Sequence, residues 1–278
     1  MAEKLPISVV VCTKNSVKTI KECIESIIRN EPSEIIIVDG GSTDGTVDIV
    51  RKFTDKIFFD RGKGLGYARQ LGAEKANMEY VAYIDSDVVL PTNSILKNML
   101  REIIEKNWDG IHAQIICPSV NNYWEWGEDL YFRFGFNQLR EVKRMATMVA
   151  LLRRELIIKY KFDPFFVKTA EDHDFYYRCY TDGCKFGISK EVAYHYHRSS
   201  FKSFMNQKIR YGMGIAQMFW KYRTVKSLFG IPYTFLKNIS IALNHRQIKL
   251  IPYFFFYSLF ELIGFIEELG RLLLISRK

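Results

Sequence analysis

Two aspartates separated by one residue follow the apolar run Tyr80–Ile84, in the segment Asp85-Ser86-Asp87. If the chain stays extended there, both carboxylates point the same way, about 6–7 Å apart, because each residue of a strand rises about 3.3 Å. Carboxylate oxygens suit Mg2+ or Mn2+ held together with substrate phosphates. The alternative is a simple turn, in which the side chains hydrogen-bond to neighbouring backbone.

Other polar residues that could do chemistry also stand at the ends of apolar runs. Thr13 and Asn15 follow the run Ile7–Cys12, and Asp39 closes a second run just before Gly40-Gly41. Asp39 suits hydrogen bonding to a ligand N–H, or a turn stabilised by its own side chain. The cluster Glu171-Asp172-His173-Asp174 offers a general base, or simply acids that favour a helix N-terminus.

The first 110 residues alternate short apolar runs with segments of helical periodicity, a pattern typical of an α/β fold. It predicts a Rossmann-like, mostly parallel sheet flanked by helices, with right-handed crossovers. Ligands bind at the carboxyl ends of such strands, so Thr13, Asn15, Asp39 and the Asp85–Asp87 segment should line one crevice. The expected strands are 7–12, 35–38, 56–59 and 80–84, and the expected helices are 17–28, 47–50, 64–76 and 95–104.

Beyond residue 110 the pattern loosens. Strands are expected at 111–117 and 147–152 and a helix at 171–179, with an aromatic segment from Trp124 to Phe136. We therefore expect one domain at 1–200, whose pattern changes near residue 110. Residues 201–278 form a C-terminal amphipathic helical extension.

Charge and cysteine usage add two expectations. The net charge of +9 arises in the C-terminal tail, where residues 198–278 carry 13 Lys and Arg against Glu261, Glu267 and Glu268. The five cysteines are scattered without CxxC spacing, and the first residues lack the apolar run of a signal peptide. These features predict a protein of the reducing cytoplasm without a thiol-based zinc site.

The tail combines apolar, aromatic and basic residues. Leu250–Phe260 is apolar except for Ser258 but is shorter than the roughly 20 residues that a spanning helix needs. Farther along, Ser258, Glu261, Glu268 and Arg271 share one helix side, and Phe256, Leu259, Ile263, Ile266 and Leu273 belong to an apolar remainder. This pattern predicts attachment to an anionic membrane surface. The alternatives are a helix pair that covers the catalytic core and a homo-oligomer interface, whereas nucleic acid is not expected.

Four motifs in order carry a resemblance to a known family: Val38–Thr46, Gly66–Gly72, Asp85–Asp87 and Ala170–Asp174. Together they resemble glycosyltransferase family 2, inverting enzymes of the GT-A fold that take sugars from nucleotide donors. The resemblance covers roughly residues 5–200 and is specific as a set. It implies a catalytic domain at 1–200, with a nucleotide-binding half at 1–110 and an acceptor-binding half at 111–200. In the second half, the aromatic segment from Trp124 to Phe136 fits either an acceptor site or plain core.

The resemblance implies a role for each matched residue. Asp39 would read the nucleobase, Thr13 and Asn15 would surround the nucleoside, and Arg69 would contact the nucleotide. In the DxD segment, Asp87 would bind Mn2+ or Mg2+ directly, while Asp85 and Ser86 would contact the donor, Asp85 at the ribose or at a metal-bound water. His197, in preference to His195, would be a further ligand of the metal or the donor phosphates. Asp172 would be the general base.

The function expected from these assignments is inverting, metal-dependent sugar transfer. The donor is a nucleotide-sugar, with a UDP-sugar favoured and a GDP-sugar as the alternative, and the acceptor is a polyprenyl phosphate or a lipid-linked glycan. The enzyme would be peripheral on the cytoplasmic face of the membrane. A sugar nucleotidyltransferase is a second candidate, but Thr13-Lys14-Asn15-Ser16 lacks the glycine-rich basic loop that it needs. A non-catalytic nucleotide-binding scaffold is the third, and the joint presence of Asp39, Asp85, Asp87 and Asp172 argues against it.

Overall fold

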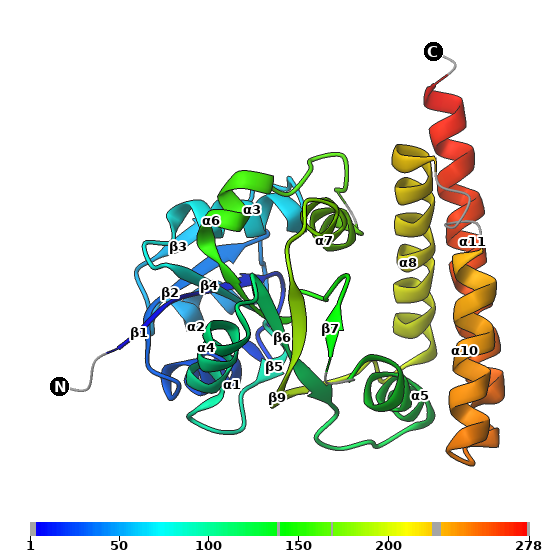
Figure 1. The fold of residues 1–278 in the computed structure, drawn as a ribbon, viewed down its shortest axis with the longest axis horizontal. Coiled ribbons are helices and arrows are strands. Elements are labelled where there is room, and N and C mark those ends of the chain that lie inside the picture. The colour runs from blue at the N-terminus through cyan, green and yellow to red at the C-terminus, as the bar shows by residue number, and fades with distance from the viewer. Residues whose placement is uncertain (1–3, 138–139, 168, 224–228, 277–278) are drawn as a thin grey trace. The chain divides into compact units, whose positions relative to one another are not determined.

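The computed structural model describes residues 4–137, 140–167, 169–223 and 229–276 (Figure 1). The chain divides into two compact units. The first, here called the sheet unit, comprises Met1–Ile116, Gln138–Val167 and Glu171–Tyr196. The second, the helical unit, comprises Cys117–Asn137, Lys168–Ala170 and His197–Lys278. The expected domain boundary near residue 200 stays a prediction, and the aromatic segment after residue 116 groups with the tail.

The sheet unit contains the predicted alternation of strands and helices. Its strands are β1 Leu5–Thr13, β2 Pro32–Asp39, β3 Ile57–Phe59, β4 Tyr80–Ile84, β5 Val88–Val89, β6 Gly110–Ile116, β7 Glu141–Val142, β8 Val149–Arg153 and β9 Phe186–His195. Its helices are α1 Ile20–Ile28, α2 Thr46–Val50, α3 Leu65–Lys75, α4 Ile95–Lys106, α6 Arg154–Tyr160 and α7 Glu171–Thr181.

Within the described residues, nine strands form one mixed sheet. The order along the sheet is β3-β2-β1-β4-β8-β6-β9-β5, and β7 also pairs with β9. The strands β3, β2, β1 and β4 are parallel to one another, as predicted. The strand β8 lies antiparallel between β4 and β6, and β5 and β7 are antiparallel to β9. The four parallel strands therefore bring their carboxyl ends to one edge.

Burial on both faces of the sheet explains its apolar strands. The helices α1 and α4 cover one face, and α3, α6 and α7 cover the other (Figure 1). Five successive residues of β1, Ile7 to Val11, are buried, as expected for a strand covered by helices on both sides. Contact between α3 and β1 is close because Gly72 has no side chain: a Cβ there would lie 2.3 Å from Val10 Cγ1.

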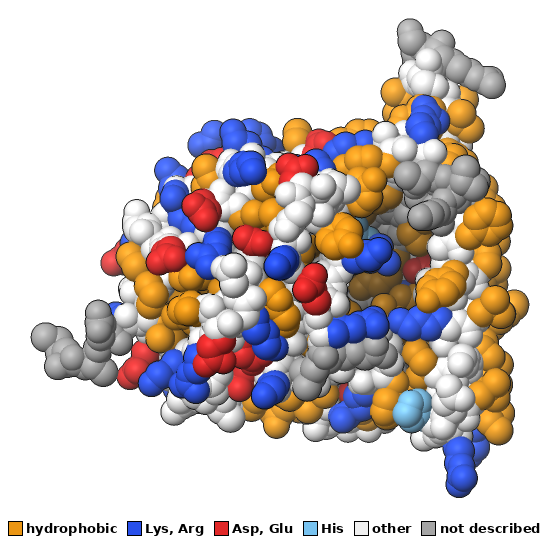
Figure 2. Space-filling view, viewed as in Figure 1, with side chains coloured by type: hydrophobic (Ala, Val, Ile, Leu, Met, Phe, Trp, Pro, Cys, Tyr) orange, Lys and Arg blue, Asp and Glu red, His pale blue; other side chains and the backbone are white. Residues whose placement is uncertain are grey.

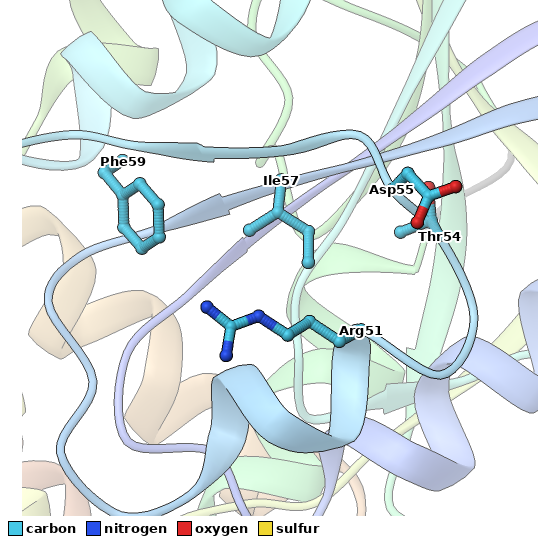
Figure 3. A pocket seen from close by; sticks show the side chains of 5 residues that line it. All are labelled: Arg51, Thr54, Asp55, Ile57 and Phe59. Carbon is cyan, nitrogen blue, oxygen red and sulfur yellow. The ribbon is translucent and has the colours of Figure 1, made fainter.

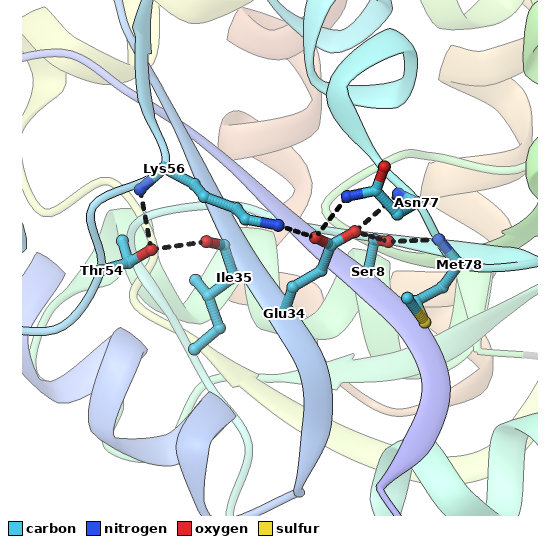
Figure 4. Close-up of polar contacts among 7 residues, drawn as sticks. All are labelled: Ser8, Glu34, Ile35, Thr54, Lys56, Asn77 and Met78. Carbon is cyan, nitrogen blue, oxygen red and sulfur yellow. Dashed lines mark hydrogen bonds and ion pairs between the residues drawn. The ribbon is translucent and has the colours of Figure 1, made fainter.

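A polar cluster around Glu34 ties together several strands near their N-terminal ends (Figure 4). Glu34 Oε1 accepts hydrogen bonds from Ser8 Oγ and, at 2.6 Å, from the Asn77 backbone N–H. Glu34 Oε2 accepts from Lys56 Nζ and, at 3.1 Å, from Asn77 Nδ2. Burial alone would raise the pKa of Glu34, but these donors lower it to about 2. The cluster connects β1, β2, the chain leading into β3, and the turn before β4.

This cluster gives a prediction for stability against acid. Because the pKa of Glu34 is about 2 in the folded chain and 4.5 for an unperturbed glutamate, its contribution to the free energy of unfolding is complete above pH 4.5 and disappears as the pH falls toward 2. We expect Glu34→Gln to lower the free energy of unfolding by about 1–3 kcal/mol at neutral pH, since hydrogen bonds to a charged group are lost. The variant should also lose less stability than the wild type between these pH values.

Urea unfolding followed by circular dichroism at several pH values measures both effects. Glu105→Gln is the matched control, because Glu105 is an exposed residue of α4. Equal unfolding free energies for the wild type and Glu34→Gln at neutral pH would contradict the account of the cluster.

The helical unit is built from α5 Tyr123–Tyr131, the π-helix η1 Phe132–Phe136, α8 Phe201–Tyr222, α10 Gly230–Asn244, the short 3-10 helix η2 Ile248–Leu250 and α11 Ile251–Ile275. Its aromatic core includes Phe204, Tyr253 and Phe254. Trp124 stacks on Phe204, with ring centroids 4.9 Å apart, and so belongs to this packing. The helical pattern expected for the tail is present in all its described parts.

Of the described residues, one helical stretch, Ile248–Ile275, is long and apolar enough to cross a membrane, with a mean hydropathy of 1.5 over an 18-residue window. The expectation that the apolar run is too short to span is wrong for the helix as a whole, because α11 continues through Glu261. Buried core helices pass the same test, and 44% of this window is buried. A spanning helix and a buried core helix therefore share this length and composition.

Candidate functional site

The ends of β1 and β2 place Thr13 beside Asp39. The two residues are paired in the parallel register, and the Gly40 N–H donates to the Thr13 carbonyl at 2.8 Å. Asp39 Oδ2 accepts from the backbone N–H groups of Gly41 and Ser42, both at 2.8 Å, so the turn considered from the sequence is present. Among the described residues, however, the buried Asp39 Oδ1 and Thr13 Oγ1 have no hydrogen-bond partner.

These two atoms matter because buried polar atoms rarely lack partners in native proteins. An unpartnered carboxylate oxygen next to an unpartnered hydroxyl suits a ligand that brings an N–H donor. Asp39 is 1% exposed, and the turn provides hydrogen bonds to its Oδ2 but none to its Oδ1. A ligand N–H would provide the missing hydrogen bond to Oδ1. The arrangement fits the expected contact with a nucleobase, which stays a prediction.

Asn15 connects the loop after β1 to the loop after β2. It has a positive φ of 52°, its backbone N–H donates to Ser42 Oγ at 2.8 Å, and its Oδ1 accepts from the Thr43 N–H at 2.9 Å. In the structure Asn15 thus holds the loop after β1 against the loop after β2. Its predicted contact with the nucleoside is untested.

The Asp85-Ser86-Asp87 segment is a turn, not an extended strand. The Val88 N–H donates to the Asp85 carbonyl at 3.0 Å, because the chain leaves β4 and reverses into β5, which pairs with β9. The expected extended geometry is therefore wrong. The Ser86 and Ser16 hydroxyls are 2.8 Å apart, which joins this turn to the loop after β1.

The two aspartates of the turn face different partners. Asp85 Oδ1 lies 3.6 Å from Arg69 Nη2, and Asp87 Oδ1 lies 3.4 Å from His195 Nε2. Burial raises the pKa of Asp85 to about 6, with Arg69 opposing this rise and Asp87 adding to it. Both side chains remain partly exposed, so oxygen ligands from outside the protein can reach them.

Arg69 joins two motifs that are about a hundred residues apart in the sequence. Its guanidinium contacts Asp85 and also donates from Nη1 to Glu171 Oε1 at 2.5 Å. The Tyr83 hydroxyl donates to the Arg69 carbonyl at 2.9 Å, which fixes α3 against β4. Burial raises the pKa of Glu171 to about 7 although Arg69 opposes the rise. The Asp85–Asp87 turn and the start of α7 therefore lie at one place.

Asp172 stands at the start of α7. Its Oδ2 accepts from Thr147 Oγ1 at 3.3 Å, and its Oδ1 accepts from the His173 backbone N–H at 2.8 Å. The second contact satisfies a backbone N–H at the helix start, as expected if the acid only favours the helix N-terminus. The Asp172 side chain is nevertheless partly exposed. Asp172 is thus positioned as a partly accessible carboxylate next to the Arg69–Glu171 pair.

The two histidines lie in different surroundings. His195, the last residue of β9, is beside Asp87 in the sheet unit. His197 belongs to the helical unit, where its ring stacks on Phe132 and its Nε2 lies 4.0 Å from Asp129 Oδ1. The sequence favours His197, but the structure places His195 beside Asp87. His195 is therefore the stronger candidate for a ligand. Which of them contacts a metal stays a prediction.

Glu171 is the residue near the site that sequence reasoning did not assign. It was noted only as a capping acid, although its position next to Asp172 and the buried arginine of α3 could have suggested an ion pair. Among the described residues, no group of three or more His, Cys, Asp or Glu side chains forms a ready-made metal site.

A separate hollow of about 400 Å3 lies along the edge strand β3 and is lined by Arg51, Thr54, Asp55, Ile57 and Phe59 (Figure 3). The Arg51 side chain extends alongside Ile57 and Phe59 (Figure 3). None of the predicted site residues lines this hollow. The polar residues at the strand ends are accordingly the better candidates for catalysis.

Comparisons with known proteins bear on this site. The family model "Glycosyl transferase family 2" matches residues 8–161. The chain is 30% identical over 188 residues to the cholesterol galactosyltransferase of Borreliella burgdorferi, covering 57% of this chain and 51% of that protein. A second relative is the dolichyl N-acetyl-alpha-D-glucosaminyl phosphate 3-beta-D-2,3-diacetamido-2,3-dideoxy-beta-D-glucuronosyltransferase of Methanococcus voltae. The chain is 26% identical to it over 259 residues, which cover 83% of this chain and 79% of that protein. The chain spans about half the length of the first relative.

Solved structures resemble the fold at low sequence identity. The mannosyltransferase PcManGT from Pyrobaculum calidifontis in complex with GDP-Man and Mn2+ has a TM-score of 0.65 at 15% identity, covering 96% of this chain and 88% of that chain. Staphylococcus aureus TarS 1–349 in complex with UDP-GlcNAc has a TM-score of 0.55 at 17% identity, covering 96% and 91%. At these identities the likeness shows a common fold.

Proposed function

This chain belongs to glycosyl transferase family 2, and we propose that it transfers a sugar from a nucleotide donor to a lipid-linked acceptor, with inversion and with a divalent cation. Its mixed sheet and its structural neighbours give it the GT-A fold expected from the sequence. The observation that carries the proposal is the position of Arg69, which joins the Asp85–Asp87 turn to the acidic start of α7. Donor-binding and base candidates thereby meet at one edge of the sheet.

The donor would be held along the ends of β1, β2 and β4. Asp39 Oδ1 and Thr13 Oγ1 offer hydrogen-bond capacity to the nucleobase and nucleoside, and Asn15 and Ser86 shape the loops beside them. The neighbours bound to UDP-GlcNAc and to GDP-Man support nucleotide-sugars of either base. We favour a UDP-sugar, with a GDP-sugar as the alternative.

The residues of the turn fit a Mg2+ or Mn2+ ion. Two partly exposed carboxylates provide oxygen ligands, and these metals commonly bind through one or two carboxylates plus substrate phosphates. Asp87 would be the direct ligand, with Asp85 at the ribose or a metal-bound water and His195 beside Asp87. A bound cation supplies neutralisation of the charge that develops on the departing nucleoside diphosphate.

Asp172 would act as the general base. An acceptor hydroxyl oxygen attacks the anomeric carbon, its proton passes to an Asp172 carboxylate oxygen, and the bond between the anomeric carbon and the diphosphate oxygen breaks. The bonding electron pair leaves with the nucleoside diphosphate, so attack from the opposite side inverts the anomeric centre. Thr147 and the His173 N–H position the carboxylate for this step.

A lipid-linked acceptor and a location at the cytoplasmic face of a membrane complete the proposal. The relatives named as a cholesterol galactosyltransferase and a dolichyl-phosphate sugar transferase support a lipid acceptor. Five free cysteines agree with a reducing compartment.

One assay tests this function against the other candidates. The full chain is incubated with labelled UDP- and GDP-sugars, Mn2+ and a lipid extract, and sugar transfer to lipid and release of nucleoside diphosphate are followed. We expect both to occur together. Pyrophosphate release would instead indicate a nucleotidyltransferase, and the absence of turnover with retained nucleotide binding would indicate a scaffold.

A further inference from the structure

The helices α10 and α11 expose a wide apolar surface, here called the apolar face. Figure 2 shows hydrophobic side chains gathered along these helices. Exposure is large at several positions, for example 66% at Leu236 and 62% at Ile266. The exposed members are Tyr233, Leu236, Leu243, Phe255, Leu262, Ile263, Ile266, Leu273 and Leu274.

Polar residues of the same unit point inward. The Lys208 ammonium of α8 donates to Glu128 Oε2 at 2.6 Å, and the Tyr253 hydroxyl donates to the same oxygen at 2.6 Å. Gln217 Nε2 donates to Glu268 Oε1 at 2.7 Å. The side of α11 expected to be polar is therefore turned into the unit, because Ser258, Glu261 and Glu268 are buried and only Arg271 is exposed.

The same helix also buries apolar residues such as Tyr253, Phe254 and Phe260, so α11 is apolar both toward the unit and away from it. A helix that is apolar all round belongs to a protein core or to lipid, and not to a water-exposed surface. Helices in a lipid environment gain nothing from burying apolar side chains against one another, so they associate through close packing and interhelical hydrogen bonds. Both features are present between α8 and α11. A Cβ on Gly212 would lie 1.9 Å from the Glu261 carbonyl oxygen, and a Cβ on Gly264 would lie 1.9 Å from the Ile209 carbonyl oxygen.

The exposed charge of the helical unit is almost entirely basic. Of its acids, only Glu267 is exposed, whereas Glu125, Glu128, Asp129, Glu261 and Glu268 are buried. Its exposed basic residues, among those described, are Arg133, Arg198, Lys202, Arg210, Arg223, Arg246, Lys249 and Arg271. Arg246 and Lys249 lie in the turn between α10 and α11, at one end of the apolar face. This charge complements anionic lipid headgroups.

We propose that the apolar face is embedded in the acyl chains of an anionic bilayer, with α10 and α11 lying in the membrane plane. This inference rests on the proposed function for one point, that the surface is a membrane. It adds which face is embedded and how the helices lie. An in-plane orientation follows from two facts. α10 has 15 residues, fewer than the roughly 20 that span a bilayer. Also, α8 runs along α11 and exposes Lys202 and Arg210, which a spanning bundle would carry into hydrocarbon.

A second copy of the chain is a less suitable occupant of this face. Two identical surfaces would bring basic residues of the same sign together at the rim, and nearly all the acids that could pair with them are buried. An anionic bilayer provides both an apolar layer and opposite charge.

Vesicle flotation of the full chain tests the proposal. The wild type should float with phosphatidylcholine vesicles that contain phosphatidylglycerol and should keep part of this binding at high salt, because apolar burial is not screened. The double variant Leu262→Asp/Ile266→Asp should lower the partition coefficient by roughly 100-fold, since two charges replace two apolar side chains. Ile28→Asp/Ile104→Asp, at exposed positions of the sheet unit, should partition like the wild type.

Fluorescence measures the depth of insertion. A tryptophan introduced as Ile266→Trp should be quenched by lipids brominated on the acyl chain beyond the quenching of the wild type, and Ile104→Trp should add no quenching. Equal partitioning of the wild type and Leu262→Asp/Ile266→Asp would overturn the proposal, as would complete loss of binding at high salt. A lipid-free dimer that this double variant converts to monomer would also overturn it and identify a homo-oligomer interface.

Donor turnover keeps this test separate from the proposed function. Nucleoside diphosphate release by the Leu262→Asp/Ile266→Asp variant reports on the sheet unit without the membrane. Failed flotation with intact turnover would refute only the membrane proposal, and intact flotation without turnover would refute only the enzymatic one.

Discussion

Replacing Asp87 with alanine should reduce sugar transfer by about 100- to 1,000-fold, the loss typical when a group that stabilises transition-state charge is removed. Asp87 lies in the turn after β4, partly exposed and beside His195, where its carboxylate can hold a cation against the donor diphosphate. Without this ligand the diphosphate would leave with its charge uncompensated. Initial rates of nucleoside diphosphate release over a series of Mn2+ concentrations measure the effect.

Asp48→Ala is the matched control for this prediction. Asp48 is an exposed carboxylate of α2 that pairs only with Arg51 on the surface, so its loss should leave the rate unchanged. A folded Asp87→Ala protein, judged by circular dichroism and its unfolding midpoint, that retains wild-type turnover would refute the assignment of Asp87.

Replacing Asp172 with asparagine should lower turnover by about 100- to 10,000-fold, the range associated with loss of a general base. The amide keeps the size of the side chain and can still accept the hydrogen bonds from Thr147 and the His173 N–H, so donor affinity should stay close to that of the wild type. Single-turnover kinetics with titration of the donor separates binding from chemistry.

The capping role of Asp172 predicts a different outcome. Its Oδ1 accepts from the His173 N–H at the start of α7, so a purely structural residue would give a less stable variant with an unchanged rate. Weakened donor binding in Asp172→Asn would likewise contradict the assignment as base and place the residue at the donor.

The nucleotide-binding half of the sheet could be predicted from the sequence because local signals are strong there. Apolar runs at β1, β2 and β4, each followed by polar residues, indicate parallel strands that end at one edge. The sequence therefore predicts that Thr13, Asp39 and Asp85 lie at the same edge of the sheet. The helix α6 and the short strands β5 and β7 were not predicted, because two or three turns of helix and two-residue strands leave little periodicity.

The direction of β8 could not be predicted in the same way. Its apolar sequence indicates a strand, but antiparallel insertion between β4 and β6 depends on pairings with segments far away in the sequence. The Asp85–Asp87 turn has a similar cause. An extended segment and a turn share the same residues, and the reversal depends on β5 pairing with β9, which the local sequence does not encode.

Helical periodicity in the tail identified the polar side of α11 but not its orientation. A polar stripe faces water in a soluble domain, whereas here Glu268 accepts a hydrogen bond from Gln217 of α8, which lies 51 positions earlier in the chain. Only the packed helices show that Glu261 and Glu268 are inside and that Ile266 is outside. The burial of these two acids is thus a property of the tertiary structure.

Binding of a nucleoside diphosphate to the full chain, measured by isothermal titration calorimetry with Mn2+ and again with EDTA, tests the central claim most directly. If Asp39, Arg69, Asp85 and Asp87 bind the donor and its cation, UDP or GDP should bind in the presence of Mn2+. The affinity should fall sharply when the cation is removed. Binding that is equally tight in EDTA, or no binding of either nucleotide with Mn2+, would contradict the account.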